Sequence, residues 1–198
     1  QLESGNYSGD LAIAAGTSFK YASTEDQTLA GVISGAGDLI KDAGSALILT
    51  GVNTHTGTID IDQGSLVIGG AGQLESGDYA GAIDIANGAT LQYASSAAQT
   101  LSGVISGSGS LVKDSADSAL TLSGVNTHTG AIDLDQGSIV IAASGQLQSG
   151  DYAGGMDIAS GATLQYSSSA NQIVSGVISG QGTLVKDTVD SSTLTLSA

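Results

Sequence analysis

The stretch GVISGAGDLIKDAGSALILTGVNTHTGTIDIDQGSLVI at residues 31–68 decides the fold, because the chain contains it more than once. It returns nearly unchanged at 103–141 and begins again at 176–196. Repeats of this kind build elongated stacks in which each unit buries its apolar face against its neighbours. Almost every polar residue therefore has a copy one repeat away, whereas a catalytic centre needs a unique constellation.

The flanking sequence repeats with the same period. QLESGNYSGDLAI at 1–13 returns as QLESGDYAGAIDI at 73–85 and as QLQSGDYAGGMDI at 146–158. The offset is 72 residues and then 73, and the extra residue falls within 113–120. We expect one continuous segment, 1–198, with sequence repeats 1–72, 73–145 and 146–198. The last copy is incomplete, so we interpret the chain as a fragment of a longer array.

Composition indicates turn-rich β structure. The chain has 30 Gly, no Pro, no Cys, no Trp and one Phe, and its apolar residues come in short bursts of Leu, Ile and Val. The bursts alternate in polarity: Ile83 and Ile85 flank Asp84, for example. Alternation with a period of two places one face of a strand inward and the other outward.

Strands at roughly ten-residue spacing allow either a sandwich or barrel, or a parallel β-helix. The very short bursts, the lack of a Trp or Cys core plug and the lack of a linker at 68–77 favour the helix. The sequence therefore predicts an all-β parallel β-helix with about three strands per coil. We expect about seven coils and a rod roughly 35 Å long. The predicted core ladder contains Leu47, Leu49, Leu66 and Ile68 and their copies.

Charge excludes two classes of partner. Four Lys, no Arg and 19 Asp plus Glu give a net charge of −15. Nucleic-acid binding depends on basic residues that neutralise phosphates, and anionic membrane surfaces attract basic segments. No stretch approaches the roughly 20 apolar residues of a membrane span. We therefore expect neither nucleic acid nor direct membrane insertion of this segment.

The 31–68 segment resembles the passenger-associated repeat of autotransporters, found in AIDA-like and pertactin-like adhesin passengers. The resemblance rests on glycines, alternating aliphatic residues and the Asn-Thr-x-Thr-Gly turn. The matching positions are Gly35, Gly37, Leu39, Lys41, Leu47, Leu49, Gly51, Asn53, Thr54, Thr56, Gly57, Ile59, Gly64, Leu66 and Ile68. His55 and His128 occupy the position that is usually aromatic, and Pro is missing altogether.

The resemblance implies a right-handed parallel β-helix that is secreted through the outer membrane of a Gram-negative bacterium. It implies an extracellular place on the cell surface, usually as the shaft of an adhesin or of a self-associating protein. Repeats of this family do no chemistry themselves.

Four aspartates are candidate Ca²⁺ ligands. Asp60 and Asp62, repeated as Asp133 and Asp135, alternate with inward isoleucine or leucine, so we expect them to face solvent. Paired carboxylates can bind Ca²⁺, which takes several oxygen ligands. The spacing lacks the dense pattern of a Ca²⁺ loop, and the favoured interpretation is a solvated face without a metal.

The histidines and lysines have structural interpretations. His55 and His128 have no Cys beside them and lie more than one coil apart, so turn packing is favoured over a metal site. Lys41, Lys113 and Lys186 share parity with inward leucines. We expect each stem to cover the edge of the core at a corner while its ammonium reaches water.

The tyrosines leave two interpretations open. Tyr79 and Tyr152 form one series and Tyr93 and Tyr166 another, with Tyr7 and Tyr21 as the first-copy members. Exposed rings would be contacts for a glycan or a protein partner, whereas recurring rings at coil corners would be packing elements.

We therefore expect a structural and adhesive segment of a secreted bacterial surface protein, without enzymatic activity or a cofactor. Its expected partners are further copies of itself, or glycans and proteins of a host or cell surface. The alternative is a carbohydrate-binding or polysaccharide-processing β-helix, which needs exposed tyrosines or a groove unique to one copy. An ice- or mineral-binding face would need a regular Thr array, but THT occurs once per repeat only.

Overall fold

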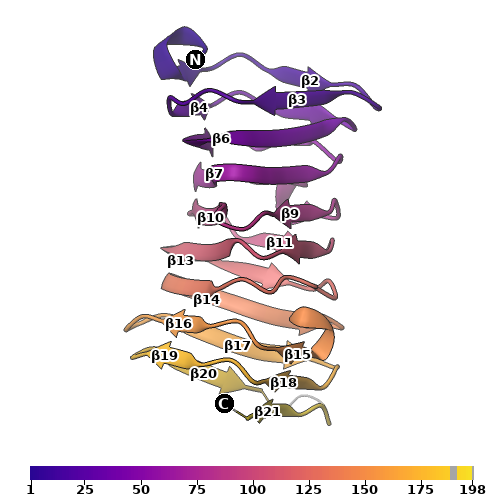
Figure 1. Cartoon of the computed structure of the whole chain (residues 1–198), viewed down its shortest axis with the longest axis vertical. Coiled ribbons are helices and arrows are strands. Elements are labelled where there is room, and N and C mark those ends of the chain that lie inside the picture. The colour runs from indigo at the N-terminus through magenta and orange to yellow at the C-terminus, as the bar shows by residue number, and fades with distance from the viewer. Residues whose placement is uncertain (188–190, 198) are drawn as a thin grey trace.

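The computed structural model describes residues 1–187 and 191–197. Parallel strands stack as a β-solenoid of about nine turns, which rises along one axis from the N-terminus at one end to the C-terminus at the other (Figure 1). The predicted parallel β-helix is confirmed, but the expected seven coils are too few. Each coil contains fewer residues than the strand spacing in the sequence suggested. Nine coils make a rod of roughly 40 Å at the inter-strand spacing.

The described residues form strands in three sheets and three single turns of 3₁₀-helix. The large sheet holds β1 (Asn6–Tyr7), β3 (Ser18–Tyr21), β4 (Gln27–Leu29), β6 (Asp38–Leu49), β7 (Ile59–Gly70), β8 (Asp78–Tyr79), β9 (Ile83–Ile85), β10 (Thr90–Ser95), β11 (Gln99–Leu101), β12 (Ile105–Gly107), β13 (Ser110–Leu122), β14 (Ile132–Ala143), β16 (Met156–Ile158), β17 (Thr163–Ser168), β19 (Ile178–Gly180) and β20 (Thr183–Lys186). The smaller sheets are β2 (Leu11–Ile13) with β5 (Ile33–Gly35), and β15 (Asp151–Tyr152) with β18 (Gln172–Val174) and β21 (Leu194–Leu196). The 3₁₀ turns are η1 (Glu3–Gly5), η2 (Glu75–Gly77) and η3 (Gln148–Gly150).

Register stacks the inward side chains into columns along the rod. One column contains a residue from each of nine coils, spaced 19 to 25 positions apart in sequence. Its members are Tyr7, Leu29, Leu49, Ile68, Tyr93, Lys113, Leu134, Ile158 and Gly180. A second column begins one repeat later and runs through Tyr79, Leu101, Leu122, Ile141, Tyr166 and Lys186.

These columns form the hydrophobic core. Leu47, Leu49, Leu66 and Ile68 are each at most 1 % exposed, which confirms the predicted ladder. Inward and outward residues alternate along the strands, as the period-two pattern predicts. Thr121, between buried Leu120 and Leu122, faces outward and is only partly covered.

The extra residue of the second copy lies in a bulge. In the first copy the ladder between β6 and β7 shifts register between Asp42 and Ala46, and in the second copy the shift lies between Asp114 and Ala119. A β-bulge absorbs an additional residue in one strand and leaves the flanking pairs in register. The two copies of the core ladder therefore keep the same pairing despite the change in length.

Glycines at the corners let neighbouring coils approach closely. A Cβ atom on Gly130 would lie 1.7 Å from the carbonyl oxygen of Gly109 in the preceding coil. Real Cβ atoms do not approach backbone so closely, so a side chain there would push the coils apart. This contact explains why glycine recurs at this point of each repeat.

Candidate functional site

The four candidate aspartates lie on the outer surface of the strands that the sequence assigns to them. Asp60 is partly buried and Asp62 is exposed, and Asp133 and Asp135 repeat that arrangement. Asp60 pairs in register with Asp84 of the next coil. Similarly, Asp133 stacks on Asp157. Carboxylates from successive coils therefore stack above one another on the outside of the rod.

Burial, with the neighbouring carboxylate charges as a smaller cause, raises the pKa of the partly buried member of each ladder. The pKa of the Asp60 carboxyl lies above its usual value because of burial first and then the charges of Asp38, Asp62 and Asp84. Burial, followed by the Asp135 and Asp157 charges, raises the pKa of Asp133. A bound cation would oppose such a shift.

Neighbouring serines already serve these ladders as donors. The Ser106 hydroxyl donates to Asp84 at 2.6 Å, and Ser179 donates to Asp157 at 2.7 Å. Within residues 1–187 and 191–197, no three His, Cys, Asp or Glu side chains gather in an arrangement that could hold a metal ion. The arrangement is an acidic outer surface in which serine hydroxyls donate to Asp84 and Asp157.

The tyrosines that were candidates for a glycan or partner contact are inside the rod. Tyr79 and Tyr152 are fully buried, and Tyr93 and Tyr166 are 2 % exposed. The Tyr79 hydroxyl donates to the Gly57 carbonyl, and the pKa of Tyr79 is strongly raised, mainly by burial. Stacking against a sugar needs an exposed ring face, and the structure provides none at these four positions.

The second tyrosine series packs against the lysines. The Lys41 ammonium lies 5.7 Å from the centroid of the Tyr21 ring, and Lys113 lies 5.9 Å from that of Tyr93. A cation over an aromatic face at this distance is an attractive contact. Lys186 repeats it 5.8 Å from the Tyr166 ring.

The expectation that the ammonium group reaches water is wrong for Lys41 and Lys113, whereas the Lys186 side chain keeps some exposed surface. Lys41 and Lys113 have no exposed surface. The Lys41 ammonium donates to the Ala43 carbonyl and, at 3.2 Å, to the Gln63 carbonyl, and Lys113 donates to Ser115. The bulge after each lysine turns the Ala43 and Ser115 carbonyls inward, so backbone oxygens replace water as acceptors. Burial lowers the pKa of both lysines.

Both histidines pack in turns. His55 and His128 are 2 % and 3 % exposed, and a ring nitrogen of each lies within hydrogen-bond distance of the Gly37 and Gly109 carbonyls, at 2.6 and 2.7 Å. Burial lowers the pKa of both rings. The His55 ring stacks on Tyr79 with centroids 6.2 Å apart. The histidines thus fill the usual aromatic position as packing elements.

Buried amides are polar residues that the sequence analysis did not single out. Gln99 accepts from the Leu74 N–H at 2.8 Å and donates to the Leu74 carbonyl at 3.1 Å, which continues the backbone ladder across a gap. Asn53 accepts from the Ile33 N–H at 2.8 Å. The recurrence of Gln and Asn beside short strands is the signal that would have found them, because unpaired buried backbone groups need partners.

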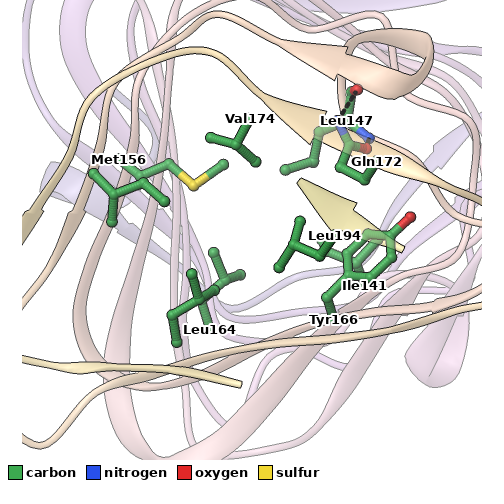
Figure 2. Close-up of a pocket in the computed structure, with 10 residues that line it drawn as sticks. Ile141, Leu147, Met156, Leu164, Tyr166, Gln172, Val174 and Leu194 are labelled. Atoms are coloured by element: carbon green, nitrogen blue, oxygen red, sulfur yellow. Dashed lines mark hydrogen bonds between the residues drawn. The ribbon is translucent and has the colours of Figure 1, made fainter. Parts of the chain in front are cut away.

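The interior is closely packed. A cavity of about 10 Å³, roughly the space of one water molecule, lies near the C-terminal end. Figure 2 shows aliphatic side chains, including Met156, Val174 and Leu164, surrounding it, while the Tyr166 hydroxyl points away. A larger open hollow lies at the N-terminal end beside Phe19 and Lys20, where the Lys20 ammonium is paired with Asp42.

Copies of the motif lie on different sides of the rod. Leu101 and Leu122 are neighbours in one column, so the chain between them makes one full coil. Lys113 lies within this coil but belongs to the other column. Tyr7 and its copy Tyr79 head these two separate columns. A repeat is thus longer than three coils by part of a turn, and each copy of an outward side chain faces a new direction.

The comparison with protein families agrees with this architecture. Residues 39–68 and 117–141 match the family described as passenger-associated-transport-repeat. Both segments are passenger-associated transport repeats. The repeat is found in autotransporter passenger domains. No curated protein and no solved structure matches the chain.

In the structure, the first matched segment covers most of two long strands and the corner between them, and the second covers the end of one long strand, the corner and most of the next strand. The first repeat starts within β6 and ends within β7, and the second starts within β13 and ends within β14. Both segments contain the Asn-Thr-His-Thr turn, and the first also contains the whole bulge, so the shared motif is made of fold-determining residues. None of the described residues forms a helix with the length and apolarity that a membrane crossing requires.

Proposed function

We propose that this segment is the shaft of a secreted bacterial surface protein and that it carries no enzymatic activity. The observation that supports this most is the repetition of one order of residues, Tyr-Leu-Leu-Ile-Tyr-Lys, in two columns of the core. Polar groups inside the rod are bonded to backbone and serve the stack. Passenger repeats of autotransporters are exported to the cell surface, and that family assignment supports an extracellular location.

We further propose that the shaft associates laterally with copies of itself. Valines at the corners offer an uncharged surface: Val104 and Val125 are each 42 % exposed. Their neighbours Gly103 and Gly124 stack directly, so the two valines lie in adjacent coils. Two such pairs can exclude water between rods, although each contact is small.

The net charge of −15 opposes this association. Salt screens repulsion between exposed charges, and protonation removes it as pH falls toward the sequence pI of about 4.1. Sedimentation velocity across salt and pH therefore tests the proposal. Association should grow as salt rises and as pH falls. A strictly monomeric chain at high concentration under all conditions would leave only the shaft role.

A charge placed on the valine surface tests its location. Val125→Asp should weaken association by restoring repulsion where the rods meet. Ser160→Asp is the matched control, because Ser160 is exposed on a turn in another coil and the added charge is the same. Equal weakening by both substitutions would show that net charge alone governs association.

A further inference from the structure

The turn between β9 and β10 has a conformation that three copies share. Ala89 N–H donates to the Ala86 carbonyl at 2.9 Å, and Gly88 has a φ of +82°. Asn87, between them, does not have a positive φ. A closed four-residue turn with a positive φ only at its third residue is a type II turn. The other copies place Ala15–Gly16 and Ser160–Gly161 in the same turn.

In this turn, neither the Asn87 side-chain amide nor the backbone nitrogen that follows it is held by a hydrogen bond to a described residue. Asn87 is exposed, and within the described part of the chain neither its side chain nor the Gly88 N–H has a hydrogen-bond partner. A Cβ atom on Gly88 would meet nothing within 4 Å. Glycine has no side chain that would hinder the approach of its nitrogen to the side-chain carbon of Asn87.

We propose that Asn87–Gly88 is a site of spontaneous deamidation in the folded rod. The Gly88 backbone nitrogen attacks the side-chain carbonyl carbon of Asn87 and forms a five-membered succinimide. The C–N bond of the amide breaks, and ammonia leaves with the proton released by the attacking nitrogen. Water then opens the succinimide at one of its two carbonyls, which yields either aspartate or isoaspartate at position 87.

No other asparagine combines these conditions. Asn53 and Asn126 are buried, their amides are bonded to backbone, and threonine follows each. The Asn171 side chain accepts from the Thr193 N–H at 2.9 Å and precedes Gln172. Asn6 precedes Tyr7 in β1, where a bulky side chain and the strand pairing hinder the approach of the nitrogen.

Deamidation would change both the charge and the geometry of a corner. The Ala86 N–H donates to the Ile61 carbonyl at 2.9 Å, so Asn87 lies next to the coil that carries exposed Asp62. A new carboxylate there adds repulsion to the acidic surface. Isoaspartate also inserts a methylene into the main chain at the point where β9 turns into β10.

Incubation of the full folded chain in mildly alkaline buffer, followed by peptide mapping by mass spectrometry, tests the proposal. Asn87 should deamidate at least about tenfold faster than each of the other asparagines, with isoaspartate among the products. Enzymatic methylation of isoaspartate gives an independent readout. Asn87 that stays intact in the folded chain, or that reacts only in denaturant, would overturn the proposal.

The third copy provides the matched variant. Ser160→Asn creates the same dipeptide in the same turn, so position 160 should then deamidate at a rate similar to that of Asn87. Asn87→Ala should abolish the fast product and restore the residue type of the first copy, where Ala15 occupies this position. A Ser160→Asn chain in which position 160 remains unreacted would show that the turn geometry does not promote the reaction.

Discussion

Two columns of the core, headed by Tyr7 and Tyr79, contain the same order of residues on different sides of the rod. In the first, Leu49 stacks between Leu29 and Ile68. In the second, Leu122 stacks between Leu101 and Ile141. The order of residue types in the core is therefore the same in both columns. The outward side chains of the two copies, however, point in different directions.

The repeat therefore affects the stability of the core and the arrangement of the outer surface in different ways. Core energetics depend on nearest neighbours along a column, which are equivalent in both places. Outward side chains such as Asp60 and Asp133 are equally equivalent in sequence but belong to different columns. Several copies of one outward residue thus do not line up into a single flat binding surface, contrary to the simple expectation for a repeat protein.

The largest expected effect is on the rate of trypsin cleavage, which should differ between the buried lysines and the exposed Lys20. Trypsin must draw a lysine into its pocket, and Lys113 is fully buried whereas the Lys20 side chain is about half exposed. Cleavage after Lys113 or Lys41 requires opening of the stack and is slowed by the unfolding equilibrium, a factor of roughly 10³ or more for a stable domain. Cleavage after Lys20, in the first coils, should come first in an intact-mass time course. Early fragments ending at Lys113 would show that this corner opens locally.

Substitutions in the two columns should have equal effects. Leu49→Ala and Leu122→Ala should each lower the free energy of unfolding by about 2–5 kcal/mol, because both side chains are at most 1 % exposed. Thr121→Ala, facing outward, should cost less than about 0.5 kcal/mol. Urea denaturation of the three variants checks this. A large difference between the two leucine variants would mean that a position along the rod matters more than the neighbours in a column.

A corner glycine should be less tolerant than a glycine in open space. Gly130→Ala should cost about 1–3 kcal/mol, because the added methyl group collides with the Gly109 carbonyl and the coils must shift. Gly155→Ala is the control, since Gly155 has no neighbour within 4 Å of an added Cβ and no positive φ. Thermal unfolding of both variants measures the contrast. Equal melting temperatures would show that the corner adapts without cost.

Much of this fold is predictable from the sequence, because the determinants are periodic. Alternation placed Leu47 inward and Thr121 outward, and the repeat itself indicated a stack. The number of coils was underestimated because alternation does not measure how few residues a corner needs. The rotation between copies is likewise a property of coil length, which only the pairing register reveals.

The candidate sites were predicted less well, for a physical reason. A lysine with inward parity was expected to extend its ammonium to water, since burial of a charge is costly. The structure instead places the Lys41 ammonium against the Ala43 carbonyl of its own bulge, the Gln63 carbonyl of the next coil and the Tyr21 ring. Such compensation comes from backbone groups, which carry no sequence signal. For the tyrosines the sequence leaves two interpretations open, and burial of all four rings agrees with packing elements and not with exposed contacts.

The smallest expected effect is the change in stability on removing one outer carboxylate, Asp133, measured at two pH values. Burial and the neighbouring Asp135 and Asp157 charges raise the pKa of Asp133 in the folded state. The folded chain then binds this proton more readily than the unfolded chain, so the group favours folding at low pH and this contribution is lost as pH rises through the folded pKa.

Asp133→Asn removes the charge, and the variant should be more stable than the parent at pH 7 by up to about 1 kcal/mol, since the site is partly solvated. The gain should shrink as pH approaches the unfolded value of about 3.9, where the parent carboxyl is also protonated. Denaturation at the two pH values measures it, and a gain that grows at low pH would mean that repulsion within the ladder is not what the substitution relieves.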